Sequence, residues 1–180
     1  MHSFTTERLL IRPLTKQDRE LYISLYCDAK VMRNIAAPLS IGSARKAFDN
    51  TLKAMQTLPC KVLTWVIVKK FSNQAIGIQA FNFNDKTNDK SAEIGIMLST
   101  KEQNTGLGKE AVSALLHYGF SRCVLDMVTV LYAKKNLASD KLFSSLNFIL
   151  AASPTSISNN TEEMYSIQKR LLYKKTNLLC

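Results

Sequence analysis

The sequence has few of the residues that bind metals or form disulfides. It contains two histidines and four cysteines, and no two of the cysteines form a CxxC pair. The cysteines are Cys27, Cys60, Cys123 and Cys180. Because a protein zinc site usually takes ligands at short local spacing, we expect no metal site. Scattered cysteines are typical of reduced thiols in a reducing compartment.

Long apolar runs are also missing. No stretch approaches the ~18 apolar residues that a membrane span requires. The opening segment MHSFTTERLLIRPL carries Glu7, Arg8 and Arg12 where a signal peptide would have its apolar core. We therefore expect a cytoplasmic protein without a membrane partner. With 46% hydrophobic and 21% charged residues, no linker and no repeat, residues 1–180 are expected to form one globular domain.

The sequence has fewer acidic than basic residues. The chain has 24 Lys and Arg against 14 Asp and Glu, a net charge of +10 with neutral histidines. This balance favours an anionic partner, such as a phosphorylated cofactor, nucleic acid or an acidic protein surface. The positive charges are scattered and form no basic stripe interleaved with aromatic residues, which argues against a dedicated nucleic-acid-binding protein.

With only six glycines and four prolines, the turns must use Asn, Asp and Ser, and polar clusters predict loops at 84–90 and 153–161. Apolar alternation and β-branched content predict strands at 9–14, 62–70, 75–84, 91–99, 127–133, 148–152 and 163–169. Helical spacing predicts helices from a Thr15 cap to Tyr26, from Ser43 onward, over 106–123 and over 136–146, with a short one possible at 29–35. The order β-α-α-β-β-β-α-β-α-β-β predicts an α/β (α+β) fold with a mixed sheet.

One segment, EIGIMLSTKEQNTGLGKE, is the most informative for chemistry. Its loop contains Gln103, Gly106 and Gly108 in the order QxxGxG, between a predicted strand and a predicted helix. Glycines there allow a tight turn and close approach of a ligand, and the helix N-terminus suits a pyrophosphate. Glu110 after Lys109 excludes a Walker A loop, and no GxGxxG is present. Taken alone, the motif is equally compatible with an ordinary glycine-rich turn.

The segment QNTGLGKEA resembles the acyl-CoA-binding loop of the GNAT family of N-acetyltransferases, whose pattern is [RQ]xxGx[GA]. The preceding AEIGIML is similar to that family's fourth strand. The opening TERLLIRPLTKQD, the DAKVM at 28–32 and the NLAS at 136–139 with Phe148 resemble its ribosomal-protein-alanine branch. The resemblance runs in order along nearly the whole chain. It implies a GNAT-like, mostly antiparallel central sheet of about seven strands flanked by helices.

The resemblance also implies a site for acetyl-CoA as cosubstrate. The backbone N–H groups of the loop that follows Gln103 would hold the pyrophosphate, and they belong to Asn104, Thr105, Gly106, Leu107, Gly108 and Lys109. The backbone of Ile96, Met97 and Leu98 would pair with the pantetheine arm like an added strand, and one of these N–H groups would polarise the thioester carbonyl. Asn136 is expected both to bind the pantetheine arm and to cap its helix.

For the catalytic base, Glu93 is the first candidate, since the family often has a carboxylate on this strand that acts through water. An ordinary carboxylate is a poor base for an ammonium group, so a water relay or burial would be required. Glu93 could equally be a solvated or ion-paired strand carboxylate. Glu162 and Glu163, before the last predicted strand, are alternatives.

For the acid, many members have a tyrosine seven residues after the asparagine that matches Asn136, but this chain has Phe143 there. Ser139, a position where serine occurs in the ribosomal-protein branch, could donate a hydrogen bond to the departing sulfur or could be a helix-surface serine. A second departure is Asn147 in place of the family's glycine. Asn tolerates the left-handed conformation, so the turn should survive.

Together these features predict an N-acetyltransferase that moves an acetyl group from acetyl-CoA to a primary amine. The amine would attack directly in a ternary complex, since no cysteine has an activating histidine nearby in the sequence. The acceptor would be a protein N-terminal amine, as on a ribosomal protein. The alternatives are a small-molecule amine, a non-catalytic acyl-CoA-binding protein and a basic nucleic-acid module. The sequence permits a monomer or a homodimer.

Overall fold

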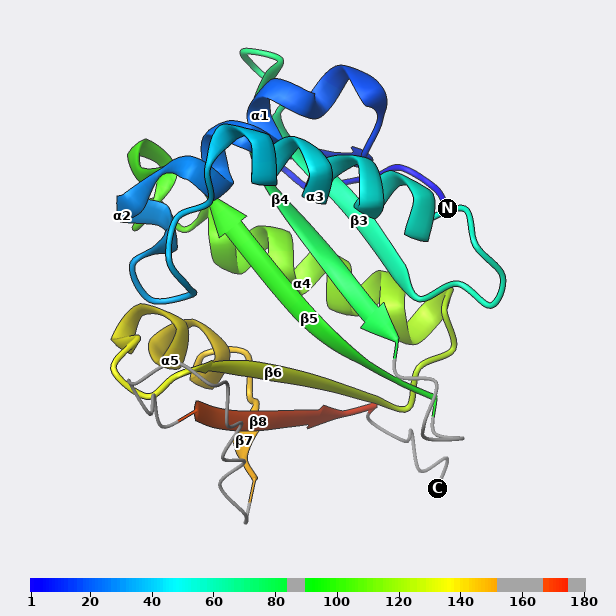
Figure 1. Ribbon diagram of the computed structural model, residues 1–180. Coiled ribbons are helices and arrows are strands. Elements are labelled where there is room, and N and C mark those ends of the chain that lie inside the picture. The colour runs from blue at the N-terminus through cyan, green and yellow to red at the C-terminus, as the bar shows by residue number, and fades with distance from the viewer. Residues whose placement is uncertain (84–89, 152–166, 175–180) are drawn as a thin grey trace, which may run out of the picture.

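The computed structural model describes residues 1–83, 90–151 and 167–174. Within these residues the chain forms one eight-stranded sheet in the order β1-β2-β3-β4-β5-β6-β8-β7, with helices on both faces (Figure 1). The strands are β1 (Phe4–Thr5), β2 (Leu9–Pro13), β3 (Val62–Lys69), β4 (Gln74–Phe83), β5 (Ser91–Leu98), β6 (Met127–Ala133), β7 (Ile149–Leu150) and β8 (Ile167–Tyr173). The helices are η1 (Lys16–Asp18), α1 (Arg19–Cys27), α2 (Ala29–Met32), α3 (Ile41–Ala54), η2 (Thr100–Glu102), α4 (Leu107–Ser121) and α5 (Leu137–Ser144).

Among the described strands, β5 and β6 are the one parallel pair, and the other neighbouring strands are antiparallel. This confirms the expected mixed, mostly antiparallel sheet. The strand beyond the expected seven is the two-residue β1, which pairs with β2 ahead of the first predicted strand. The parallel pair arises because α4 carries the chain back across the sheet between β5 and β6.

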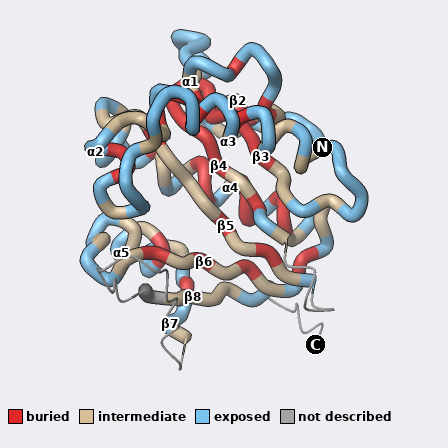
Figure 2. The backbone as a smooth tube through the Cα atoms, viewed as in Figure 1, coloured by how far each residue is buried: buried red, intermediate tan, exposed pale blue. Residues whose placement is uncertain are grey.

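Two apolar layers hold the helices on the sheet. On one face α1 and α3 contribute Leu25 and Phe48, which pack on Val66 and Ile78. On the other face α4 packs through residues that include Leu115. The buried segments of the backbone follow these two layers along the central strands (Figure 2). The side chains of β5 alternate between the layers, which decides the face on which each of its candidate site residues lies.

The boundaries of several elements differ from the prediction. The helix predicted from Ser43 begins at Ile41, because the Ser40 side chain accepts the Ser43 N–H and caps it. Thr15 leads into the short η1 before α1 begins. The strand predicted at 148–152 is reduced to β7. The strand predicted to end at Lys169 continues to Tyr173. Most of the loops predicted at 84–90 and 153–161, and the start of the 163–169 strand, lie outside the described residues.

The sheet opens between β5 and β6. These strands pair only where Ser91–Glu93 meet Met127–Thr129, and beyond that register they diverge (Figure 1). The Ser99 N–H donates to the Ile76 carbonyl of β4, and hydrogen-bonding direction alternates along a strand. The backbone groups of Ile96 and Leu98, beyond this register, therefore face β6 without a strand partner there. We call this the unpaired edge of β5.

Candidate functional site

The loop between β5 and α4 has two residues in the left-handed region. Asn104 has a φ of 62° and Gly106 a φ of 81°. Gly106 is the residue immediately before the helix, so a glycine is required there by the backbone conformation. Gly108 lies inside the first turn, where an added Cβ would contact Leu98 Cδ1 at 3.4 Å. The helix thus begins close against the end of β5.

The backbone N–H groups of this loop are free. Within the described chain, none of the N–H groups of residues 104–109 donates a hydrogen bond. They precede and open α4, a helix of 15 residues, whose N-terminal end carries partial positive charge. Most of these residues are exposed, so a ligand can reach them. A run of free donors at a helix N-terminus fits an anionic group such as a pyrophosphate.

Gln103 fastens the loop to β5. Its Nε2 donates to the Leu98 carbonyl at 3.1 Å, and the Thr105 hydroxyl donates to the Glu102 carbonyl at 2.7 Å. One acceptor of the unpaired edge of β5 is therefore satisfied by the first residue of the motif. The N–H and C=O of Ile96 and the N–H of Leu98 remain directed toward β6 without a strand partner. The N–H of Met97, by the same alternation, is directed to Ile78 on β4.

Glu93 lies at the last register where β5 and β6 still pair, opposite Thr129. Alternation places it on the same face as Met97, which packs with the α1 and α3 layer. Its half-buried carboxylate has no hydrogen bond or ion pair to any described residue. Burial raises the pKa of Glu93 above its usual range, and the charge of Lys169 on β8 acts against this rise. An unpaired carboxylate with a raised pKa is a better base than an ordinary one.

Some candidate residues in and around α5 have a structural role, and one has a side chain that is available to a ligand. Asn136 precedes α5, and its side-chain oxygen accepts the Ser139 N–H at 3.2 Å, so the expected capping role is confirmed. The Ser139 hydroxyl makes no hydrogen bond within the described chain and is half-buried. Phe143 is 2% exposed and packs edge-to-face on Phe148, so it belongs to the core. Asn147 has a φ of 64°, as expected from its place in the turn.

Parallel strands end at the same end of a sheet, so the loop after β5 and the start of α5 after β6 lie at one end (Figure 1). The structure therefore places residues 104–109, the unpaired edge of β5 and Ser139 at the same end of the sheet. Glu93 lies five residues before the end of β5, about 16 Å along the strand. No hydrogen bond joins Glu93 to Ser139. Glu162 and Glu163 lie outside the described residues.

Sequence reasoning missed the residue that ties this loop to the rest of the molecule. Arg8 donates from Nη1 to the Thr105 carbonyl at 3.3 Å, across 97 positions of sequence. No local pattern around Arg8 or Thr105 indicates this contact. Glu110, next to the loop in the sequence, also binds Arg8, but its position does not indicate this partner.

The described residues offer neither a membrane span nor a metal cluster. No helix among them is long and apolar enough to cross a membrane. No group of three or more His, Cys, Asp or Glu side chains among them is arranged to hold a metal ion.

Comparison with known proteins identifies the family. Residues 8–149 match the family described as acetyltransferase (GNAT) domain. The match covers most of the chain, and the chain therefore belongs to the GNAT family of acetyltransferases. The uncharacterized N-acetyltransferase p20 of Bacillus licheniformis is 30% identical over 152 residues, which cover 82% of this chain and 83% of p20.

Solved structures share the fold at low sequence identity. Spermidine N-acetyltransferase from Vibrio cholerae, in complex with CoA and spermine, superimposes with a TM-score of 0.79 at 15% identity and covers 93% of this chain and 96% of its own. The ribosomal L7/L12 alpha-N-protein acetyltransferase RimL, in complex with CoA, gives a TM-score of 0.78 at 18% identity, with 93% and 95% covered. One fold thus serves enzymes named for a polyamine and for a protein.

Proposed function

We propose that this protein is an acetyl-CoA-dependent N-acetyltransferase that acylates a primary amine by direct attack in a ternary complex. The observation that carries the proposal is the run of free N–H donors at residues 104–109, placed at the same end of the sheet as the unpaired edge of β5. Membership of the GNAT family supports it. When bound, acetyl-CoA supplies the acetyl group as a reactive thioester.

The chain's own residues divide the task of holding the cosubstrate. The N–H groups of 104–109 bind the pyrophosphate, with Gln103 keeping the loop against β5. The peptide groups of Ile96 and Leu98 bind the pantetheine arm, because they face β6 and Met97 does not. Asn136 binds the arm as well as capping α5. An edge of free peptide groups accepts an extended ligand in the way it would accept another strand.

Two side chains serve the chemistry. Glu93 takes the proton of the incoming ammonium group through water. It acts apart from Ser139, because it lies on the face of β5 that α1 and α3 cover and makes no hydrogen bond to Ser139. Its raised pKa makes it a stronger base than an exposed glutamate. Ser139 donates a hydrogen bond to the departing sulfur from its free hydroxyl. Phe143, buried in the core and without a proton to donate, takes no part in this step.

For the acceptor we propose a protein N-terminal amine, as in the RimL relative, which is named for ribosomal L7/L12. The net charge of +10 supports this choice, because it works against binding of a polycation such as the spermine found in the Vibrio cholerae enzyme. A small-molecule monoamine is the second candidate, since charge alone does not work against it.

The test combines binding and turnover. Calorimetry with CoA should show saturable binding, and release of free CoA thiol from acetyl-CoA should depend on an added amine. Peptides with a free N-terminal Ala or Ser are the first acceptors, the same peptides with a blocked N-terminus are the matched controls, and spermine is the polyamine comparison. Binding without turnover for any amine would establish a non-catalytic acyl-CoA-binding protein. Absence of CoA binding at millimolar concentration would refute the proposal.

A further inference from the structure

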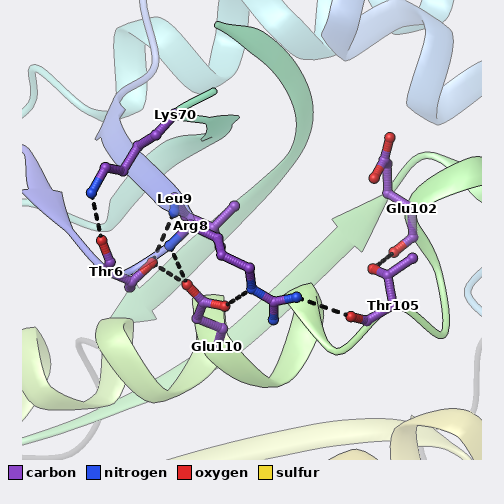
Figure 3. A network of polar contacts seen from close by, with 7 residues as sticks. All are labelled: Thr6, Arg8, Leu9, Lys70, Glu102, Thr105 and Glu110. Carbon is purple, nitrogen blue, oxygen red and sulfur yellow. Dashed lines mark hydrogen bonds and ion pairs between the residues drawn. The ribbon is translucent and has the colours of Figure 1, made fainter. Parts of the chain in front are cut away.

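The Glu110 carboxylate, in the first turn of α4, accepts hydrogen bonds from three donors in the segment before β2 (Figure 3). The Thr6 hydroxyl and the Arg8 backbone N–H donate to Oε1, the latter at 2.9 Å, and Arg8 Nε donates to Oε2 at 2.6 Å. The Glu110 side chain is 17% exposed. The residues just before β2 are therefore fastened to the helix that opens at the candidate site.

The same guanidinium also contacts the loop. While Nε binds Glu110, Nη1 donates to the Thr105 carbonyl at 3.3 Å (Figure 3). Nη2 lies 3.4 Å from the position that a Cβ on Gly106 would occupy. The planar guanidinium fixes the directions of its N–H groups, so it links the helix and the loop in one geometry. A lysine, with one nitrogen, cannot reproduce this link.

Contact with Arg8 decides which way the Thr105–Gly106 peptide faces. In a planar trans peptide the C=O and the N–H point in opposite directions. Because the Thr105 carbonyl faces Arg8, the Gly106 N–H faces away from Arg8. The carbonyl that would repel a phosphate is thus paired with a cation, and the donor is left free.

The support behind Arg8 is itself held in place. The Thr6 hydroxyl accepts the Leu9 N–H at 2.9 Å, and Lys70 Nζ donates to the Thr6 carbonyl at 3.1 Å (Figure 3). Thr6 therefore presents its hydroxyl to Glu110 in a fixed orientation. The contacts extend from the β3–β4 turn, through the residues before β2, to the first turn of α4.

We propose that Arg8 is a positioning residue for the cofactor loop. Through Glu110 and Thr105 it holds residues 104–109 with their N–H groups turned toward the ligand, and the residues before β2 thereby form part of the cofactor site. The inference rests on the proposed function, since it takes this loop as the site that binds the CoA pyrophosphate.

The test compares Arg8→Ala and Arg8→Lys with Arg19→Ala. Arg19 is a matched control, because it forms an ion pair with Asp49 at 3.0 Å and is exposed to the same 48% as Arg8, but it joins α1 to α3 away from the loop. The measurements are the CoA Kd by calorimetry, the KM for acetyl-CoA, kcat, and urea unfolding of the free protein.

We expect Arg8→Ala to raise Kd and KM by about tenfold, the effect of one lost hydrogen bond of ordinary strength, with kcat unchanged. Arg8→Lys should behave like Arg8→Ala, because the charge is kept but the link between Glu110 and Thr105 is lost. Arg19→Ala should bind like the wild type. Removing Glu110 in addition to Arg8 should add little, because both act through one contact.

Other results would contradict either the positioning role of Arg8 or the proposed function. Wild-type Kd and KM in Arg8→Ala would overturn the inference. A lysine that restores affinity would show that charge alone matters and would also overturn it. If Arg8→Ala is too unstable to assay, Arg8→Lys decides alone. If the wild-type protein does not bind CoA, it is the proposed function that fails, and the positioning role fails with it.

Discussion

The two glycines of the loop should respond to alanine in opposite directions. Gly106 has a φ of 81°, a conformation that places an L-residue about 1–2 kcal/mol above its favoured one. An added Cβ would meet only the flexible end of Arg8, at 3.4 Å, so the strain comes from the backbone. Gly108 lies in α4, where alanine is favoured over glycine by up to about 1 kcal/mol. Its Cβ would make an ordinary contact with Leu98.

The free energies of unfolding of Gly106→Ala and Gly108→Ala should therefore differ by about 2 kcal/mol, or roughly 4–8 °C in Tm for a chain of this size. Urea unfolding without ligand measures this difference. Gly42→Ala is a suitable reference, because Gly42 lies in α3 with no atom within 4 Å of an added Cβ. This substitution should raise the free energy of unfolding by about 1 kcal/mol. Equal effects at 106 and 108, or a greater loss at 108, would refute the assignment of the left-handed position.

Four other substitutions test separate parts of the site and the core. If Glu93 is the base, kcat/KM should fall as the pH drops through its pKa, which burial raises, and Glu93→Gln should remove that limb of the pH profile. Ser139→Ala should lower kcat by roughly tenfold while leaving the CoA Kd unchanged, and an unchanged kcat would assign the sulfur contact elsewhere. Burial acts to raise the pKa of Glu110, but the hydrogen bonds from Thr6 and Arg8 lower it below 4.5. Its contribution to stability should thus be complete above pH 4.5 and lost as the pH falls through the lowered pKa, and acid unfolding of Glu110→Gln should lack this component. Gln79 is 1% exposed and its amide has no hydrogen-bond partner within the described chain, so Gln79→Leu should raise the free energy of unfolding by about 1–3 kcal/mol in urea titrations, and a loss would show that the amide is satisfied.

The loop between β5 and α4 could be predicted from the sequence because its signal is local. Gln103, Gly106 and Gly108 lie within six positions, and the structure gives each a separate part: a bond to β5, the left-handed turn and close helix packing. The strand at 127–133 was also predicted with its observed bounds, because its apolar run is contiguous and is flanked by Asp126 and the lysines that follow.

Contacts between residues far apart in the chain could not be predicted from the sequence. Arg8 and Glu110 are 102 positions apart, and nothing in the spacing of either residue pairs them. The end of β8 was missed because Arg170 interrupts its apolar pattern. The structure accommodates Arg170 by pairing it with Asp140 at 2.8 Å and with the Phe148 carbonyl at 3.1 Å. The absence of a hydrogen bond or ion pair between Glu93 and any described residue also depends on packing around it, which no local pattern records.

One spectrum would test the central claim most directly. The backbone amides of the uniformly 15N-labelled protein would be followed as CoA is added. If the loop binds the pyrophosphate and the unpaired edge of β5 binds the pantetheine arm, the largest shifts should fall on the amides of 104–109 and of Ile96 and Leu98. The amide of Met97, which is directed to β4, should move less. Saturable shifts confined to other parts of the molecule, or no shifts at millimolar CoA, would contradict the account.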